Sequence, residues 1–224
     1  LKVILDYLEK GVQELEARFG TGKGATGIVM DVNTGAVLAM ASLPTYDLNS
    51  PSTIYNDFLT AGMTEEQIIE NATDLRNKQW RSKVFNDTYE PGSTFKTLTL
   101  AMALEENVVD LSTGFYCGGN ITVEGQKIWC SKRTGHGQQD LATAFANSCN
   151  PAFINIGLRI GNAKFYQYMK DFGLVEQTGL DINGEASGFV NKEIEYSTLA
   201  LACYAFGQNF NVTPIALLAA QCAC

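Results

Sequence analysis

The sequence predicts an α/β fold in which helices pack around an antiparallel sheet. The chain has 224 residues, of which 46% are apolar and 18% charged, and this composition is typical of a globular protein. Amphipathic helical patterns recur along most of its length, and one pair of β-rich segments flanks a short turn. The length suits one domain or two small ones.

The first part of the chain predicts a helix followed by a hairpin. Apolar residues at steps of three and four from Leu1 to Phe19 form one face of a helix that we expect to end near Gly20. Residues 28–32 and 36–40 are rich in β-formers and flank an Asn/Thr/Gly turn, which is typical of a hairpin. Long surface connections should follow over 43–90, with one acidic helical patch near 64–71.

The remainder of the chain reads as mostly helical. A helix should start after Pro91, and a loop with two cysteines should cover about 112–138. Glycines end two of the later helices, and the pair Thr213-Pro214 should begin the last one. The expected later helices cover about 140–147, 151–160, 162–172 and 196–206, with loop or strand over 179–193.

The charge excludes one class of function. Sixteen basic and 24 acidic residues give a formal net charge of −8. Phosphate binding requires clustered Lys and Arg, so we expect no nucleic-acid partner.

Ser93 and Lys96 could form a nucleophile and its general base. On a helix, residues three apart share a face, and the N-terminus of a helix favours a developing oxyanion. A desolvated lysine can be neutral enough to accept a proton. The alternative is that Ser93 caps the helix and Lys96 is a solvated surface charge.

The segment Ser148-Cys149-Asn150 is a second candidate for chemistry. Its alternative role is structural, because Asn150 followed by Pro151 has the pattern of a helix cap and a first-turn proline.

Longer strings of residues support the catalytic interpretation. The string Asp87 to Lys96 (DTYEPGSTFK) resembles the first active-site motif of class B penicillin-binding proteins, and Ser148 to Phe153 (SCNPAF) resembles their second. Further family landmarks follow in the family's order along nearly the whole chain. They are residues 27–31 and 34–40, 44–49, 135–137 with 140–141, 172–174 with 178–181 and 184–185, and 206–208 with 212–214. The similarity is greatest to sporulation and division-type transpeptidases of Firmicutes-like bacteria.

This resemblance implies a serine D,D-transpeptidase that cross-links the stem peptides of peptidoglycan and is acylated by β-lactams. Ser93 would attack the peptide, Lys96 would accept its proton, Ser148 would relay a proton to the leaving group, and Asn150 would bind a substrate amide. The backbone N–H of Ser93 would be one oxyanion donor. No cofactor is expected for catalysis.

The resemblance also implies how the chain is organised. Residues 1–224 would be a partial transpeptidase domain of the penicillin-binding protein/β-lactamase-like fold, with an antiparallel sheet and an all-helical lobe over roughly 93–178. The family's third motif, Lys-Thr-Gly, is absent, and Arg133-Thr134-Gly135 imitates it in the wrong place. We expect the true motif beyond Cys224, and therefore little activity from these residues alone.

The resemblance further implies where in the cell the protein acts and with which proteins. We expect a membrane-anchored protein at the extracytoplasmic face of the bacterial membrane, with its anchor outside these residues and glycosyltransferase or division-complex proteins as partners. Two rival functions are a class D-like serine β-lactamase and a non-catalytic β-lactam sensor or division scaffold. The class D enzymes carry a hydrophobic residue where Asn150 stands, which counts against the first.

Cys117, Cys130 and His136 are spaced C-x12-C-x5-H and suit a structural zinc ion. A Cys117–Cys130 disulfide and free thiols are the alternatives. The sequence does not identify a fourth zinc ligand, and Asp87, Asp110 and Asp140 are candidates because they lie near the loop or the motifs. Cys149 is expected to serve packing, and the three later cysteines read as core residues: Cys203, Cys222 and Cys224.

Overall fold

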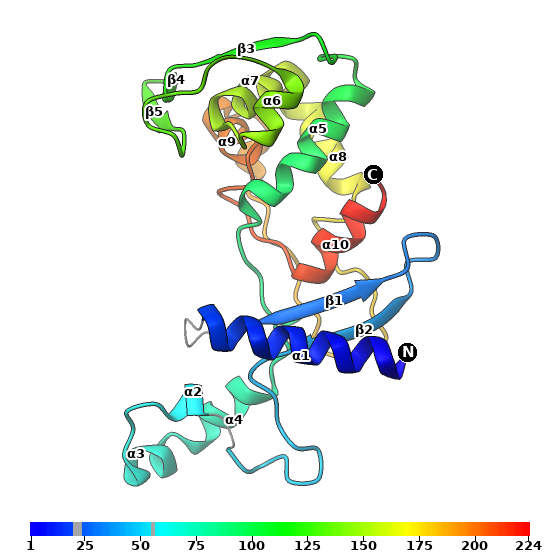
Figure 1. Ribbon diagram of the computed structural model, residues 1–224, viewed down its shortest axis with the longest axis vertical. Coiled ribbons are helices and arrows are strands. Elements are labelled where there is room, and N and C mark those ends of the chain that lie inside the picture. Colours follow the sequence, from blue (N-terminus) through cyan, green and yellow to red (C-terminus); the bar gives the residue numbers. More distant parts are fainter. Residues whose placement is uncertain (20–23, 55–56) are drawn as a thin grey trace. The chain divides into compact units, whose positions relative to one another are not determined.

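The computed structural model describes residues 1–19, 24–54 and 57–224 (Figure 1). These residues form two compact units. The first unit contains residues 1–87, 182–186 and 213–215, and the second contains 88–181, 187–212 and 216–224. The mixture of helices and antiparallel strands confirms the predicted α/β class. No described helix is both long enough and apolar enough to cross a membrane.

The first unit is built around a helix and a hairpin. Helix α1 (Lys2–Phe19) packs against strands β1 (Thr26–Met30) and β2 (Val37–Ser42), which pair antiparallel as predicted. The turn between the strands is closed by Asp31, whose Oδ1 accepts from the backbone N–H of Asn33 at 2.8 Å. Gly27 allows close packing, because a Cβ there would lie 2.6 Å from Leu8. The expected end of the first helix, Gly20, lies outside the described residues.

The region 43–90 contains more helix than predicted. Helices α2 (Asp57–Thr60), α3 (Glu65–Glu70) and α4 (Ala72–Trp80) occupy it. Helix α3 matches the acidic patch and begins with a capping box between Thr64 and Gln67. Helix α4 was missed because it is largely polar and buries only Leu75 and Gln79, so it has no apolar stripe to detect.

The second unit packs helices around a continuous apolar core. The helix after Pro91 begins as the 3₁₀ turn η1 (Gly92–Phe95) and continues as α5. The later helices lie where the sequence predicts them, and Gly161 and Gly173 adopt the positive φ of helix-ending glycines. The helices are α5 (Lys96–Glu105), α6 (Leu141–Ala146), α7 (Asn150–Ile160), α8 (Asn162–Asp171) and α9 (Thr198–Tyr204), and a short 3₁₀ turn, η2, covers Lys192–Glu195. The last helix, α10 (Pro214–Cys222), has its first two residues in the first unit and the others in the second.

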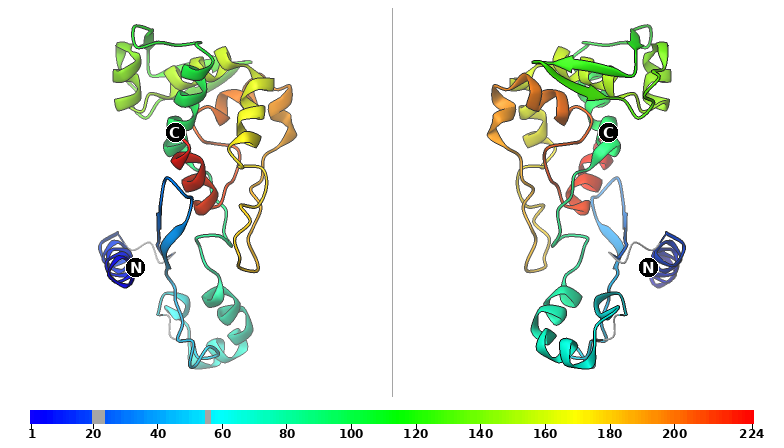
Figure 2. Two further views of the ribbon diagram at one scale, coloured as in Figure 1. Left: turned by 90° about the vertical axis from the view of Figure 1, so that its right-hand side faces the viewer. Right: turned by 90° about the vertical axis from the view of Figure 1, so that its left-hand side faces the viewer.

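Short strands occupy the stretch expected to be a loop in an all-helical lobe. Strands β3 (Gly114–Cys117) and β6 (Gly137–Asp140) pair antiparallel, as do β4 (Asn120–Val123) and β5 (Gln126–Trp129). Strand β3 contacts α6 and α7, and the pairs lie on the outer side of these helices (Figure 2). The strands were missed because each has four residues and they are rich in Gln, Asn and Gly, which gives little alternating pattern.

Gly157 should be required where α7 contacts α9. In an open helix interior, Gly→Ala stabilises by about 1 kcal/mol. Here a Cβ would lie 2.5 Å from the Cβ of Ala205, and overpacking costs about 1–3 kcal/mol. We therefore expect Gly157→Ala to lower the free energy of unfolding in urea. Gly11→Ala is the control, because a Cβ there meets nothing within 4 Å, and it should be neutral or stabilising. Equal stabilisation by both would contradict the close packing.

Candidate active site

Ser93 and Lys96 lie on one face at the junction of η1 and α5. Between them Phe95 is fully buried, with its ring 4.9 Å from that of Phe210 and 6.2 Å from that of Phe165. This anchor leaves Ser93 exposed and turns Lys96 inward, where it is 1% exposed. The Lys96 Nζ lies 3.1 Å from Ser93 Oγ. A hydroxyl open to a substrate is thus bonded to a buried amine.

Gly207 holds the segment that carries the nucleophile. The N–H of Gly92 donates to the carbonyl of Gly207 at 2.8 Å. A Cβ at Gly207 would lie 2.0 Å from the oxygen of Gly92, and Gly207 has a φ of 82°. Only glycine fits this approach.

Ser148 lies in a left-handed turn between α6 and α7. Its φ is 48°, a conformation that costs a non-glycine residue about 1 kcal/mol or more. The turn directs both oxygens of Ser148 at Lys96, whose Nζ lies 2.8 Å from the carbonyl oxygen and 2.9 Å from Oγ. The strained backbone therefore faces the reactive amine.

Asn150 is not the cap of α7. Cys149 occupies the N-cap position, and Asn150 is the first helical residue, followed by Pro151. The Asn150 carboxamide is free of capping and instead accepts from Lys96 Nζ at 2.8 Å and donates to the carbonyl of Trp129 at 3.1 Å. It links the buried amine to strand β5, and one of its N–H groups is left for a ligand.

Burial makes Lys96 a weak base for a lysine. Desolvation lowers its pKa to about 8, although charge on Cys130 and Cys149 opposes this effect. Within the described chain no carboxylate forms an ion pair with it. At pH 7 a lysine of this pKa is neutral in roughly one molecule in ten, against roughly one in three thousand at the ordinary value. The neutral amine can accept a proton from Ser93.

Arg133-Thr134-Gly135 is part of a turn and not of a strand. The N–H of Gly135 donates to the carbonyl of Lys132 at 2.9 Å, and a Cβ at Gly135 would lie 2.3 Å from the oxygen of Cys117. The guanidinium of Arg133 stacks 4.5 Å from the centre of the Trp129 ring. The imitation of the third motif thus has a structural role in this turn.

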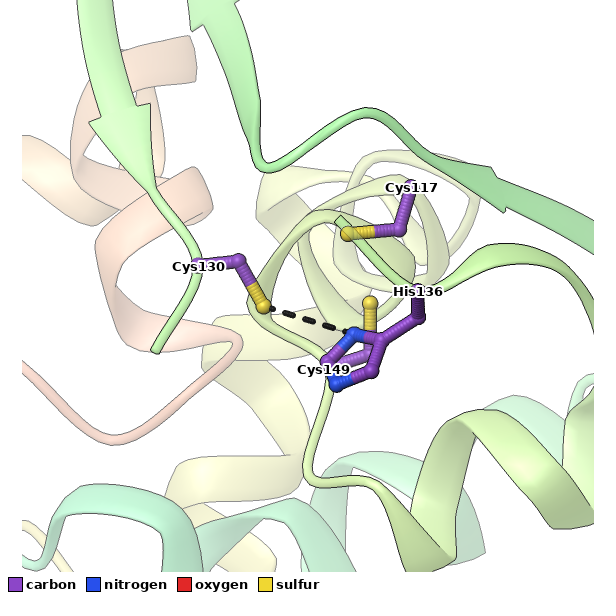
Figure 3. Close-up of side chains that lie close together, drawn as sticks. All are labelled: Cys117, Cys130, His136 and Cys149. Carbon is purple, nitrogen blue, oxygen red and sulfur yellow. Dashed lines mark hydrogen bonds between the residues drawn. The ribbon is translucent and has the colours of Figure 1, made fainter. Parts of the chain in front are cut away.

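Three cysteines and the single histidine converge next to the second motif. The ligand atoms of Cys117, Cys130, His136 and Cys149 all lie within 4.8 Å of one another, and Cys130 Sγ is 3.6 Å from His136 Nδ1 (Figure 3). The three cysteines are buried, and the histidine is half-buried. A Cys₃His set of this size matches a tetrahedral zinc site.

The cluster offers a fourth candidate ligand, Cys149, that is not among the ligands expected from the sequence. Cys149, expected to serve packing alone, completes the group, while each candidate aspartate is used elsewhere. Asp140 caps α6, Asp110 bonds to Ser112 and Thr113, and Asp87 pairs with Arg81 and Lys83. Cys117 and Cys130 are free thiols here and not a disulfide. Cys203 and Cys222 are half-buried, but Cys224 is exposed and is not a core residue.

The surroundings of the thiols differ. Burial alone would raise the pKa of Cys130, but hydrogen bonds from the backbone of Lys132 and Asn150 hold that pKa below its usual value. Burial raises the pKa of Cys149 to about 11. The buried amide nitrogen of Gln139 has no nitrogen or oxygen acceptor in the described chain, and hydrogen bonding from this side chain favours the Cys149 thiolate. N–H groups aimed at sulfur are typical of metal-bound thiolates.

Comparisons with known proteins find a family match over most of the chain. Residues 25–223 match the family described as "Penicillin binding protein transpeptidase domain". The chain is 36% identical over 214 residues to "Stage V sporulation protein D" of Bacillus subtilis, covering 95% of this chain and 30% of the relative. It is 27% identical over 216 residues to "Probable peptidoglycan D,D-transpeptidase FtsI" of Caulobacter vibrioides, covering 96% and 32%.

Solved structures agree on the fold. The transpeptidase domain of penicillin-binding protein 3 from Burkholderia pseudomallei, in its apo form, matches with a TM-score of 0.78 at 20% identity. That match covers 100% of this chain and 56% of the other. The chain spans about a third of the length of the curated relatives quoted above.

The protonation of Lys96 should control the reactivity of Ser93. Because only the neutral amine accepts a proton, acylation of Ser93 by benzylpenicillin should speed up as pH rises and level off above an apparent pKa of about 8. Stopped-flow acylation rates of the full-length protein across this range measure the effect. Lys96→Arg should remove the rise, since guanidinium stays charged. A pH-independent wild-type rate would contradict the role of a desolvated lysine.

Proposed function

The chain belongs to the penicillin-binding protein transpeptidase family, and from this membership we propose that it carries the acylating centre of a peptidoglycan D,D-transpeptidase. The observation that supports the proposal most directly is the position of Lys96 Nζ, bonded to the oxygens of Ser93, Ser148 and Asn150 at 2.8–3.1 Å. One buried amine thereby joins an exposed nucleophile to a second hydroxyl, an arrangement suited to moving a proton between them.

The proposed reaction begins at Ser93. Its Oγ gives a proton to neutral Lys96 and attacks the carbonyl carbon between the two terminal D-alanines of a stem peptide. The new C–O bond forms an ester as the C–N bond breaks. The proton passes from Lys96 through Ser148 Oγ to the departing amine, which leaves as D-alanine. The free N–H of Asn150 binds an amide oxygen of the stem peptide, and the backbone N–H of Ser93 faces the oxyanion.

The second half of the proposed reaction restores the enzyme. An amine of another stem peptide attacks the ester, a C–N bond forms, and the bond to Ser93 Oγ breaks. The proton of the attacking amine returns to Ser93 through the same residues. A β-lactam follows the first half alone, because its ring opens on Ser93 but its amine stays attached. No metal or cofactor takes part in these steps.

The location of the proposed substrate indicates the cellular location of the protein. Peptidoglycan lies outside the cytoplasmic membrane, so we place this chain at the extracytoplasmic face, held there by a membrane anchor outside these residues. Glycosyltransferase and division-complex partners remain predictions.

Replacing the nucleophile tests the proposal. In the full-length protein, Ser93→Ala should abolish both penicillin labelling and release of D-alanine from a D-alanyl-D-alanine peptide, each followed by mass spectrometry. Ser52→Ala, at an exposed serine, should leave both unchanged. The penicilloyl ester should persist for many minutes, because the amine of the opened ring stays attached where the attacking group would approach. Rapid release of penicilloate would favour a β-lactamase, and labelling that survives Ser93→Ala would overturn the assignment.

We also propose that Cys117, Cys130, His136 and Cys149 hold a structural zinc ion. The support is their convergence within 4.8 Å together with the N–H groups directed at the sulfurs of Cys130 and Cys149. The four ligands leave no open position for water, so the ion would fold the β3–β6 region against the second motif without catalysing anything.

Removing one thiol tests the zinc site. Cys117→Ser should reduce bound zinc from one equivalent to almost none and lower the melting temperature by about 5 °C or more. Cys224→Ser removes an exposed thiol outside the cluster and should change neither value. Atomic emission and differential scanning calorimetry are the measurements. A purified protein without zinc that contains a Cys117–Cys130 disulfide would contradict the proposal.

A further inference from the structure

The second unit contains a hollow that no step above uses. Its volume is about 480 Å³, within the range of ligand pockets. Three segments line it: the chain just before η1, strand β5, and the region from the start of α9 to the residues that follow it. The residues that matter for its chemistry are Glu90, Gln126, Ile128, Leu199, Cys203 and Asn209.

Each of these segments lies within three residues of a group that belongs to the candidate active site or holds it in place. Glu90 stands three residues before Ser93. Gln208, another lining residue, follows Gly207, whose carbonyl accepts from the N–H of Gly92 at 2.8 Å. Ile128 precedes Trp129, whose carbonyl accepts from Asn150 at 3.1 Å. The lining therefore contains residues that stand within three positions of Ser93, Gly207 and Trp129 along the chain.

One carboxylate sets the charge of the hollow. Among the described residues that line it, Glu90 alone is charged, and its Oε1 accepts from the N–H of Asn209 at 2.9 Å. No lysine or arginine of the described chain forms an ion pair with it. Burial, and after it the charge of Glu90, raises the pKa of Cys203, which places this carboxylate close to a lining thiol.

The cations of this region lie on the other face of β5. Side chains alternate along a strand, so Gln126 and Ile128 share the face that lines the hollow. Lys127 and Trp129 share the opposite face, where the Lys127 Nζ lies 5.3 Å from the Trp129 ring. The negative charge of Glu90 is thus left uncompensated inside the hollow.

The rest of the lining consists of apolar side chains, amides and the hydroxyl of Ser197. Ile128, Leu199 and Cys203 offer a surface for an alkyl chain, while Gln126, Gln208 and Asn209 offer amide groups for a peptide backbone. A peptide that carries a primary amine on an alkyl arm matches all three features.

We propose that this hollow binds the acceptor peptide of the cross-linking step, with its ammonium group on Glu90. The inference rests on the proposed transpeptidase function and adds to it the site and the residue that select the attacking amine. The bound ammonium first releases one proton to neutral Lys96 or to solvent. The neutral amine then forms the C–N bond to the acyl carbon, the C–O bond to Ser93 breaks, and the amine's second proton goes to Ser93 Oγ.

The partition of one acyl-enzyme between two acceptors tests this site. The full-length protein is acylated with a D-alanyl-D-alanine peptide in the presence of Nα-acetyl-lysine amide, whose side chain is a cationic alkyl amine, or hydroxylamine, which is uncharged at neutral pH. Glu90→Gln keeps an oxygen for the N–H of Asn209 but removes the charge. Transfer to the lysine amine, relative to hydrolysis, should fall about fivefold, the upper range for an exposed ion pair.

Two comparisons keep the test specific. Transfer to hydroxylamine should be the same in Glu90→Gln and wild type, and the deficit with the lysine amine should shrink at high salt. Glu105→Gln removes one exposed carboxylate from α5 and should match wild type with both acceptors.

The outcomes separate this inference from the function on which it rests. If Glu90→Gln forms the acyl-enzyme and transfers it to both acceptors as wild type does, the acceptor site is wrong and the transpeptidase assignment stands. If both transfers fall together, Glu90 acts on the fold and the inference is also wrong. If wild type forms no acyl-enzyme, the proposed function itself fails.

Discussion

The buried amine of Lys96 is the interaction on which the rest of the site depends. Four oxygens from two distant segments surround it, at Ser93, Ser148 and Asn150, and none belongs to a carboxylate. The segments reach it only because Phe95 is anchored in the core and because Ser148 accepts a left-handed backbone. The core of the second unit therefore fixes the distance between Ser93 Oγ and Lys96 Nζ.

Neutral partners also explain how the amine stays reactive. A carboxylate beside Lys96 would favour the ammonium form and raise its pKa, which would leave almost no base at neutral pH. Carbonyl, hydroxyl and carboxamide oxygens accept hydrogen bonds from Lys96 but stabilise its charged form less than a carboxylate would. Desolvation therefore has the larger effect, and the pKa of Lys96 falls to about 8. The site thus combines full hydrogen bonding with a lysine that can take a proton.

Local patterns in the sequence predict part of the fold and of the candidate site, and contacts outside each segment determine the other parts. The spacing of Ser93 and Lys96 places them on one helical face, and the Asn/Thr/Gly turn predicts the β1–β2 hairpin, because both depend on neighbours along the chain. Helix α4 and strands β3–β6 carry no clear apolar period, and β3 pairs with β6 across the intervening β4–β5 hairpin, so contacts outside each segment determine them. Asn150 had two competing roles on sequence grounds, and only the position of Lys96, 54 residues earlier, separates them.

The direction of the Cys149 side chain follows from the backbone conformation around it. Cys149 has an extended backbone, with φ −76° and ψ 106°, and neighbouring side chains of an extended segment point to opposite sides. Ser148 and Asn150 both turn to Lys96, so the side chain between them must point away, and there it meets Cys117, Cys130 and His136 (Figure 3). The oxygens bonded to Lys96 and the thiol cluster therefore lie on the two sides of one three-residue segment. A ligand that fixes Cys149 also fixes the backbone that presents Ser148 and Asn150 to the amine.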